Sequence, residues 1–213
     1  MAITIVEKND DISWDALAKI QYIAHHENRT NGIDQACAYL SGEQLKNNIG
    51  NGRCFVAMDE NKPIGIACYR ICKNYRKYWF CNGETVAELL YSALLPEYQK
   101  GNTFYKLVMT RNAAIEEDGA EIIVTDTHER NTKMRDIFIL YGFNELCYHK
   151  YISCNYISIV MAKWLNSCCP FSETLIKKKL KQSRLLLTLT VNAKGSYFFY
   201  YKVFLKIKKV IGI

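Results

Sequence analysis

Two kinds of hydrophobic pattern, one typical of strands and one typical of helices, occur in turn along the first 164 residues of the chain. Runs in which apolar and polar residues alternate, or in which β-branched and aromatic residues are concentrated, predict β-strands. These runs occupy residues 2–8, 53–58, 63–71, 85–95, 120–127, 144–151 and 156–165. The polar residues 59–62 separate the second run from the third, which predicts a hairpin.

Apolar residues spaced three or four apart predict amphipathic helices between these strands, over residues 13–28, 41–50, 104–119 and 131–143. Side chains suited to N-caps start three of them, at Ser13, Ser41 and Asn131. Glycines suited to helix ends close three of them, at Gly50, Gly119 and Gly142. The order β-α-α-β-β-β-α-β-α-β-β predicts an α/β fold with a mixed, mostly antiparallel central sheet flanked by helices.

Charge divides the chain of 213 residues into two parts. Residues 1–164 carry a formal net charge of −2 and residues 165–213 one of +9, so the basic character belongs to the C-terminal segment. We therefore predict one folded domain over residues 1–164 and a basic, aromatic C-terminal extension over residues 165–213.

The extension combines a lysine cluster at residues 177–181 with a pattern typical of two strands around Gly195. Alternate residues from 197 to 207 would form an apolar stripe. Three interpretations stay open: weak peripheral contact with an anionic membrane, a dimerisation strand in a homodimer, and a segment without an evolved role. Because the predicted sheet ends at residue 165, we expect that residues 170–213 are not needed for the core.

The nine cysteines are scattered and none forms a Cys-x-x-Cys pair, which favours reduced thiols and a cytoplasmic location. The N-terminus has no basic head followed by an apolar run, so no signal peptide is predicted. Histidines, cysteines and carboxylates are not spaced as a metal site, so we expect no bound metal. We also expect no nucleic-acid partner.

The stretch "AELLYSALLPEYQKGNTFYKLV", residues 87–108, joins a strand to a helix through a polar loop with one glycine. A helix N-terminus offers free backbone N–H groups and the positive end of the helix dipole, so it can bind phosphate or pyrophosphate. Neither a P-loop nor a dinucleotide-binding fingerprint is present. An ordinary strand-to-helix turn is the alternative.

The same stretch resembles the signature strand, loop and helix of the GNAT N-acetyltransferase superfamily, whose motif is Gln/Arg-x-x-Gly-x-Gly/Ala after a strand. The later stretch "NTKMRDIFILYGF" is similar to the family's Asn-x-x-Ala-x-x-x-Tyr-x-x-x-Gly-Phe helix, with Asn131, Gly142 and Phe143 in register. The resemblance covers residues 1 to about 164. It implies a GNAT-like fold and binding of acetyl-coenzyme A.

The resemblance also implies which residues would bind this donor. Two neighbouring strands splay apart in the family, and the exposed backbone of the first pairs with the pantetheine, here at Ala93, Leu94 and Leu95. The loop amides would bind the pyrophosphate, at Gln99, Lys100, Gly101, Asn102, Thr103 and Phe104. Asn131 and Phe138 would line the thioester end.

The loop departs from the family motif, and two registers stay open. With Gln99 at the Gln/Arg position, the glycine sites become Asn102 and Phe104, and Phe104 is bulky for an anion site. A register shifted by one residue places Gly101 and Thr103 there, but Tyr98 then replaces Gln/Arg.

Phe138 stands where the family often has the tyrosine that protonates the leaving thiolate. Tyr141, three residues later, lies on the same predicted helix face and is our candidate acid. Glu88 is our candidate base, because a carboxylate on the signature strand of some family members accepts the amine proton. An ordinary salt-bridged glutamate is the alternative.

The sequence therefore predicts an N-acetyltransferase that moves acetyl directly from acetyl-coenzyme A to a primary amine. The acceptor would be a small-molecule amine or a protein amino group. A catalytically inactive acyl-coenzyme A binder, acting as a sensor or interaction module, is the alternative, favoured by Phe104 and Phe138.

Overall fold

The computed structural model describes residues 3–33, 35–151 and 156–192. A single seven-stranded sheet runs through them in the order β1-β2-β3-β4-β5-β7-β6. The strands are β1 (Ile3–Glu7), β2 (Arg53–Asp59), β3 (Lys62–Tyr75), β4 (Glu84–Leu94), β5 (Ile122–His128), β6 (Asn144–His149) and β7 (Ser158–Trp164). The pair β4–β5 is parallel and every other pair is antiparallel, which confirms the predicted mixed, mostly antiparallel sheet.

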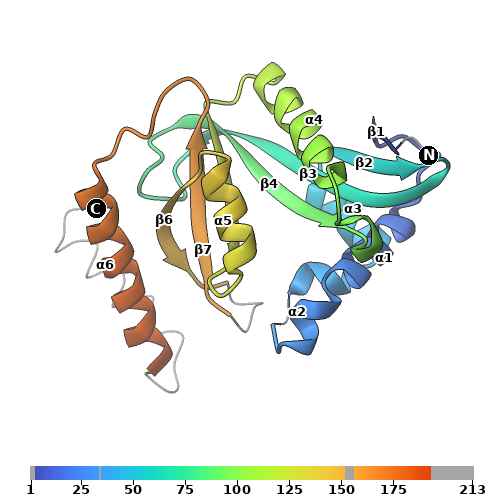
Figure 1. The fold of residues 1–213 in the computed structure, drawn as a ribbon. Helices are drawn as coiled ribbons and strands as arrows, with labels where there is room; N and C mark the ends of the chain where they lie inside the picture. Colours follow the sequence, from blue (N-terminus) through green and yellow to red (C-terminus); the bar gives the residue numbers. More distant parts are fainter. Residues whose placement is uncertain (1–2, 34, 152–155, 193–213) are drawn as a thin grey trace.

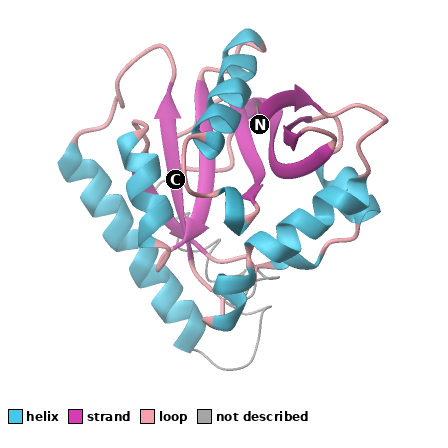
Figure 2. Ribbon diagram, turned by 45° about the vertical axis from the view of Figure 1, so that its right-hand side comes forward, coloured by secondary structure: helices cyan, strands magenta, loops and turns pink. Residues whose placement is uncertain are grey.

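Helices flank the sheet (Figures 1 and 2). The α-helices are α1 (Trp14–Ala24), α2 (His26–Thr30), α3 (Gly42–Ile49), α4 (Thr103–Glu117), α5 (Thr132–Leu140) and α6 (Glu173–Asn192). Short 3₁₀ turns cover Ala36–Tyr39 and Pro96–Tyr98. The helices α1 and α3 pack on one face of β3 and its neighbours, and α4 packs on the other (Figure 1).

Local sequence signals explain most element ends. The Ser13 hydroxyl accepts from the Asp15 N–H, and Ser41 and Gln44 form a capping box at the start of α3. The predicted hairpin is confirmed, because Asp59 pairs with Lys62 across its turn. Gly119 and Gly142, at φ +74° and +87°, adopt the left-handed conformation that ends helices α4 and α5.

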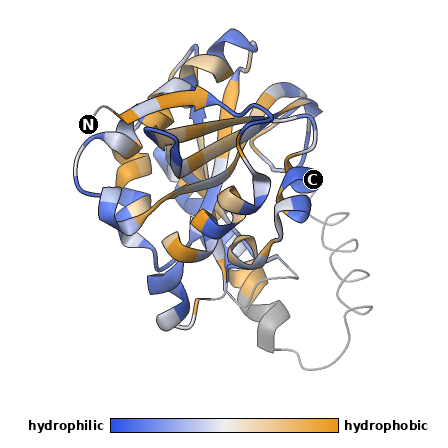
Figure 3. Ribbon diagram, turned by 90° about the vertical axis from the view of Figure 1, so that its right-hand side faces the viewer, coloured by the Kyte–Doolittle hydropathy of each residue, from blue (hydrophilic) through white to orange (hydrophobic). Residues whose placement is uncertain are grey.

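Apolar residues are concentrated in the strands (Figure 3), and those that are buried form two clusters. The larger cluster fills the space between the sheet and α1, α3 and α4. A second cluster lies around β5, β7 and β6, where the end of β3 contributes Tyr75 and the β3–β4 connection contributes Tyr78 and Phe80. The aromatic stretch after β3 is therefore part of the core.

The segment after β7 differs from the prediction. Residues 184–192 were expected in a strand, but they form the end of α6, which lies beside the edge strand β6 (Figure 1). Long runs of Leu and Thr fit either element, so the apolar pattern alone misassigned them. The predicted Gly195 turn and the apolar stripe after it lie outside the described residues.

The start of the extension packs on the domain. The ring of Phe171 lies 4.8 Å from that of Trp79 and 5.8 Å from that of Trp164, and Ile176 joins the same cluster. Phe171 and Ile176 thus contact the core, and the expectation that residues 170–213 are not needed for it stays a prediction. The domain boundary at residue 164 stays a prediction.

A bulge in β4 lies next to the point where β4 and β5 separate. Between the pairs Ile66–Ala93 and Cys68–Leu90, one residue of β3 faces two of β4, Tyr91 and Ser92. Tyr91 has φ +46°, which is rare for a residue other than glycine. Pairing of β4 with β5 ends at Glu88, so the two strands diverge beyond it.

Candidate active site

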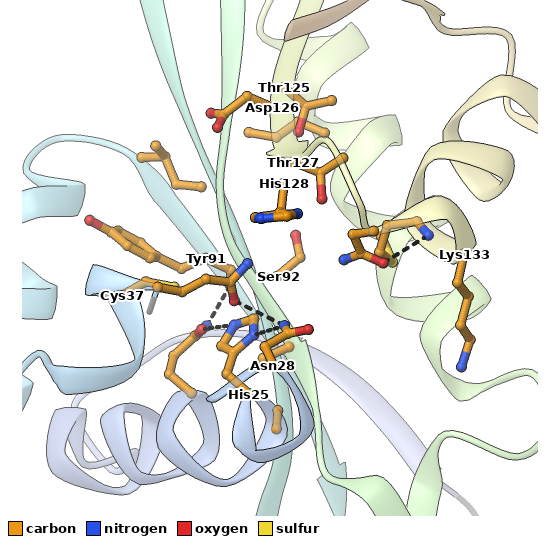
Figure 4. A pocket seen from close by; sticks show the side chains of 18 of the residues that line it. His25, Asn28, Cys37, Tyr91, Ser92, Thr125, Asp126, Thr127, His128 and Lys133 are labelled. Atoms are coloured by element: carbon orange, nitrogen blue, oxygen red, sulfur yellow. Dashed lines mark hydrogen bonds between the residues drawn. The ribbon is translucent and has the colours of Figure 1, made fainter. Parts of the chain in front are cut away.

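A cavity of about 520 Å³ opens where β4 and β5 diverge (Figure 4). Residues 89–94 of β4 and 125–128 of β5 form two of its walls. The helix α5 contributes a third wall with Met134, Ile137 and Phe138, and α1 and α2 close the opposite side. The predicted splayed strands are therefore present, and they enclose a pocket large enough for a small ligand.

The loop ahead of α4 borders this cavity through Gln99, and the first turn of α4 does so through Phe104. The Gln99 side chain donates to the Leu94 carbonyl at 3.0 Å and thereby fixes the loop against the end of β4. Gly101 has φ +115°, a conformation that side chains disfavour, so the loop depends on a glycine at this position. Thr103 begins the helix and is buried.

The predicted donor-binding residues divide into two groups. Those that line the cavity are Ala93, Leu94, Gln99, Phe104, Asn131 and Phe138. Lys100, Gly101 and Asn102 lie exposed in the loop ahead of α4, and Leu95 is buried just after β4. The Asn131 side chain caps α5 by accepting from the Met134 N–H at 3.3 Å.

Asp126, on β5, is the carboxylate that the sequence analysis missed. Its side chain is exposed to the cavity, and the Tyr151 hydroxyl donates to it at 3.2 Å. Protein surrounds the group on its other sides, and this burial raises the pKa of Asp126 above its ordinary value. A cavity carboxylate with a raised pKa accepts a proton more readily than an ordinary aspartate.

A chain of hydrogen bonds joins α1 and α2 to the bulge (Figure 4). The Gln21 amide donates to the Tyr91 carbonyl at 2.9 Å, so its oxygen accepts from His25 Nε2 at 3.2 Å. His25 Nδ1 then accepts from the Asn28 amide at 3.2 Å. Burial lowers the pKa of His25 to about 4, so the ring is neutral and serves as a fixed link in this chain.

His128, at the end of β5, is buried and lies in the cavity wall. Its Nδ1 accepts from the Arg130 N–H at 2.8 Å, which leaves the hydrogen of the neutral ring on Nε2. Burial lowers the pKa of His128, so the neutral form prevails at pH 7.

The structure does not support Glu88 as the base. Glu88 is absent from the residues that line the cavity and lies instead in an ion-pair network. Arg70 donates to its carboxylate at 2.6 Å, Tyr75 at 2.5 Å and Lys77 at 3.3 Å. Burial alone would raise the pKa of Glu88, but these hydrogen bonds and charges lower it to about 2. Glu88 is therefore a poor proton acceptor at neutral pH.

Tyr141 also lies outside the cavity lining. It is the residue at which α5 ends, and its ring packs edge-on against Tyr105 at 6.3 Å. The sequence spacing predicted that Tyr141 and Phe138 share one helix face. However, α5 ends at Leu140, and the Tyr141 side chain does not reach the cavity. The structure therefore does not support Tyr141 as the acid.

One signal in the sequence could have revealed Asp126. The stretch "IIVTDTH" places a single acid in an otherwise apolar or neutral strand, and such an acid needs a structural or chemical reason. Gln21, Asn28 and Tyr151 carry no comparable signal, because ordinary helix and loop positions are rich in these residue types.

No protein-family model matches the chain, and no curated protein matches it in sequence. Its fold, by contrast, matches solved structures. The ribosomal-protein-S18-alanine N-acetyltransferase from Escherichia coli is 16% identical, with a TM-score of 0.60 over 80% of this chain and 99% of that chain. The PaiA N-acetyltransferase from Thermoplasma acidophilum, in complex with coenzyme A, is 16% identical, with a TM-score of 0.59 over 78% and 100%.

A GNAT family acetyltransferase from Elizabethkingia anophelis, with acetyl-CoA bound, is 16% identical, with a TM-score of 0.53 over 76% of this chain and 98% of that chain. These identities are low, so the likeness shows the fold. The chain has the fold of the GNAT acetyltransferases, which confirms the fold class predicted from residues 87–108 and 131–143.

Within residues 3–33, 35–151 and 156–192, no three His, Cys, Asp or Glu side chains gather as a metal site. None of the described helices is long and apolar enough to cross a membrane.

Proposed function

We propose that this protein is an N-acetyltransferase that moves acetyl from acetyl-coenzyme A to a primary amine by direct transfer. The observation that carries the proposal is Asp126, a carboxylate with a raised pKa inside the cavity between the splayed strands of a GNAT fold. A mere acyl-coenzyme A binder has no need of such a group, so we favour the enzyme over the inactive alternative.

The described residues fit the donor. No described strand pairs with β4 beyond Glu88 on the side of β5, so an extended pantetheine chain can pair with residues 89–94 at backbone groups other than the Tyr91 and Leu94 carbonyls, which accept from Gln21 and Gln99. The N-terminus of α4, with the glycine loop ahead of it, suits the pyrophosphate. Phe104 lines the cavity beside this N-terminus and makes the anion site narrower than a glycine or alanine would.

Asp126 would act first. It accepts a proton from the acceptor ammonium group, directly or through a water molecule, and the neutral amine then attacks the thioester carbonyl carbon. A carbon–nitrogen bond forms while the carbonyl π electrons move to oxygen. The carbon–sulfur bond then breaks, and coenzyme A leaves as a thiolate or, once protonated, as a thiol. The proton left on the new amide nitrogen passes to solvent.

The acceptor belongs to the same proposal. Two carboxylates, Asp126 and Glu27, and the tyrosines 151 and 156 line the cavity, which suits a cationic amine with room for an attached group. The name of the Escherichia coli neighbour specifies a protein amino group, and we extend to this chain only the choice between a small-molecule amine and a protein amino group. The cytoplasmic location, the homodimer and the membrane contact stay predictions.

The test combines calorimetry with acetyl-coenzyme A and a free-thiol release assay over a panel of amines and peptide N-termini. We expect binding, thiol release that depends on the amine, and a loss in kcat of about 10²-fold or more for Asp126→Asn. Asp10→Asn, at an exposed position away from the cavity, is the matched control. Binding without thiol release for every acceptor would support the inactive binder instead.

A further inference from the structure

Arg111, on α4, is a buried cation that the proposed chemistry has not yet used. Its side chain is 1% exposed. Nη1 donates to the Ser92 hydroxyl oxygen at 2.9 Å, while Nε and Nη2 donate to the Asn112 side-chain oxygen at 3.3 and 3.0 Å. Both acceptor groups of these bonds, the serine hydroxyl and the asparagine amide, are neutral.

No carboxylate of the described chain forms an ion pair with Arg111. Burial lowers the pKa of Arg111 to about 10, so the guanidinium keeps its charge at neutral pH. A buried charge without a counter-ion is costly for folding, and a purely structural role would be served equally well by an apolar side chain. We therefore looked to the neighbours of Arg111 for a functional reason for its buried charge.

The position of Ser92 indicates that function. Ser92 belongs to the bulge of β4 and lines the cavity, whereas Arg111 lies behind it in the protein interior. In Figure 4 the Ser92 side chain points into the cavity towards His128. Because its oxygen accepts from Arg111, its hydrogen is directed elsewhere, and the described residues provide no acceptor for it.

We propose that Ser92 is a catalytic residue that donates a hydrogen bond to the negative charge developing on the acyl donor, and that Arg111 is a positioning residue that orients and polarises its hydroxyl. This inference rests on the proposed acetyl transfer. Hydrogen bonds in series polarise one another in a medium of low dielectric, so a guanidinium behind the serine strengthens the donor in front of it.

The charge appears in two places during the reaction. When the amine attacks, the thioester oxygen becomes an oxyanion, and when the carbon–sulfur bond breaks, the electron pair moves to sulfur. Ser92 keeps its own proton throughout and donates only a hydrogen bond. Such a donor is needed here, because Phe138 carries no proton and Tyr141 lies outside the cavity lining.

The test compares Ser92→Ala and Ser92→Thr with wild type, and Thr110→Ala, on the exposed side of α4, serves as control for loss of a hydroxyl outside the cavity. We expect Ser92→Ala to lower kcat about 10²-fold while KM and the Kd for coenzyme A change less than about threefold. Ser92→Thr keeps the hydroxyl and should restore kcat to within about tenfold of wild type. An unchanged kcat for Ser92→Ala would overturn the proposal, as would a loss that threonine fails to restore.

Arg111→Lys tests the second residue. If both residues act through one hydroxyl, the double variant Arg111→Lys/Ser92→Ala should lose hardly more kcat than Ser92→Ala alone. Losses that multiply would overturn the positioning role of Arg111. Wild-type protein that neither binds coenzyme A nor releases thiol would overturn the proposed function itself, whereas an active wild type with an unaffected Ser92→Ala overturns this inference alone.

Discussion

Replacing Glu88 by glutamine is expected to lower stability and to leave the chemistry of acetyl transfer nearly unchanged. Glu88 accepts hydrogen bonds from Arg70, Tyr75 and Lys77, and its side chain is 12% exposed. These partners stabilise the carboxylate form in the folded protein. Glutamine keeps the shape of the side chain but removes the charge, so the variant isolates the electrostatic contribution.

The magnitude follows from the pKa. Lowering the pKa of Glu88 from 4.5 to about 2 corresponds to about 3 kcal/mol, at about 1.4 kcal/mol for each pH unit. Arg70 and Lys77 are 38% and 46% exposed, and solvent screening of these partners reduces the expected loss at pH 7 to about 2 kcal/mol.

The pH dependence has a definite sign. The folded-state pKa of Glu88 is depressed, so its stabilisation is fully present above the unfolded-state pKa of about 4.5 and is lost as the pH falls through about 2. Urea unfolding of wild type and Glu88→Gln at pH 7 and at successively lower pH measures this directly. The difference in the free energy of unfolding should shrink as the pH falls below about 4.5.

Glu173→Gln is the matched control, because its ion pair with Lys177 is exposed and should contribute little. A difference for Glu88→Gln that stays the same from pH 7 to pH 3 would refute the electrostatic reasoning. A large loss of kcat in a variant of unchanged stability would refute the conclusion that Glu88 is not the base.

Three further variants test other parts of the structure. Asp126→Asn should raise the melting temperature at pH 7 but not at pH 3. The raised folded-state pKa means that the ionised carboxylate destabilises the folded protein, whereas the protonated form does not. Equal melting temperatures of wild type and variant at pH 7 would argue against the burial of this group. Phe171→Ala should destabilise the protein by about 2 kcal/mol in urea unfolding, whereas Leu185→Ala, at a side chain 59% exposed, should change little; equal effects would mean that residue 171 is not packed on the core. Gly101→Ala should weaken the thermal shift caused by coenzyme A, because alanine disfavours φ +115°, and an unchanged shift would separate the loop from donor binding.

Much of the fold could be predicted because its local signals agree with each other. Caps such as Ser13 and Ser41, the turn at residues 59–62 and the glycines after α4 and α5 each mark an element end that the structure confirms. The run at residues 184–192 has no such marker, and Leu and Thr fit both a strand and a helix. Tertiary contacts of α6 with β6 decide the matter, and these are not visible in a local pattern.

The site was harder to predict, because catalytic side chains are defined by where they point. Glu88 and Asp126 are both acids within strands, and residue type alone does not distinguish them. Cations from β3 and its following loop surround Glu88, whereas the divergence of β4 and β5 exposes Asp126. The bulge that produces this divergence carries no glycine or proline, so nothing in the sequence announces it.

The packing of α6 determines at which edge of the sheet a strand from another chain could pair. A sheet of seven strands has two edges, here β1 and β6, and an uncovered edge is a template for pairing with another chain. Along β6 the Tyr148 N–H donates to the Ser183 hydroxyl at 3.0 Å, and the Arg184 guanidinium lies 5.0 Å from the Tyr148 ring. A second copy cannot add a strand there without displacing α6, so a dimer built by sheet extension would have to join through β1, which is five residues long. The helix α6, in the segment predicted as an extension, thus covers this edge and blocks edge-to-edge pairing there.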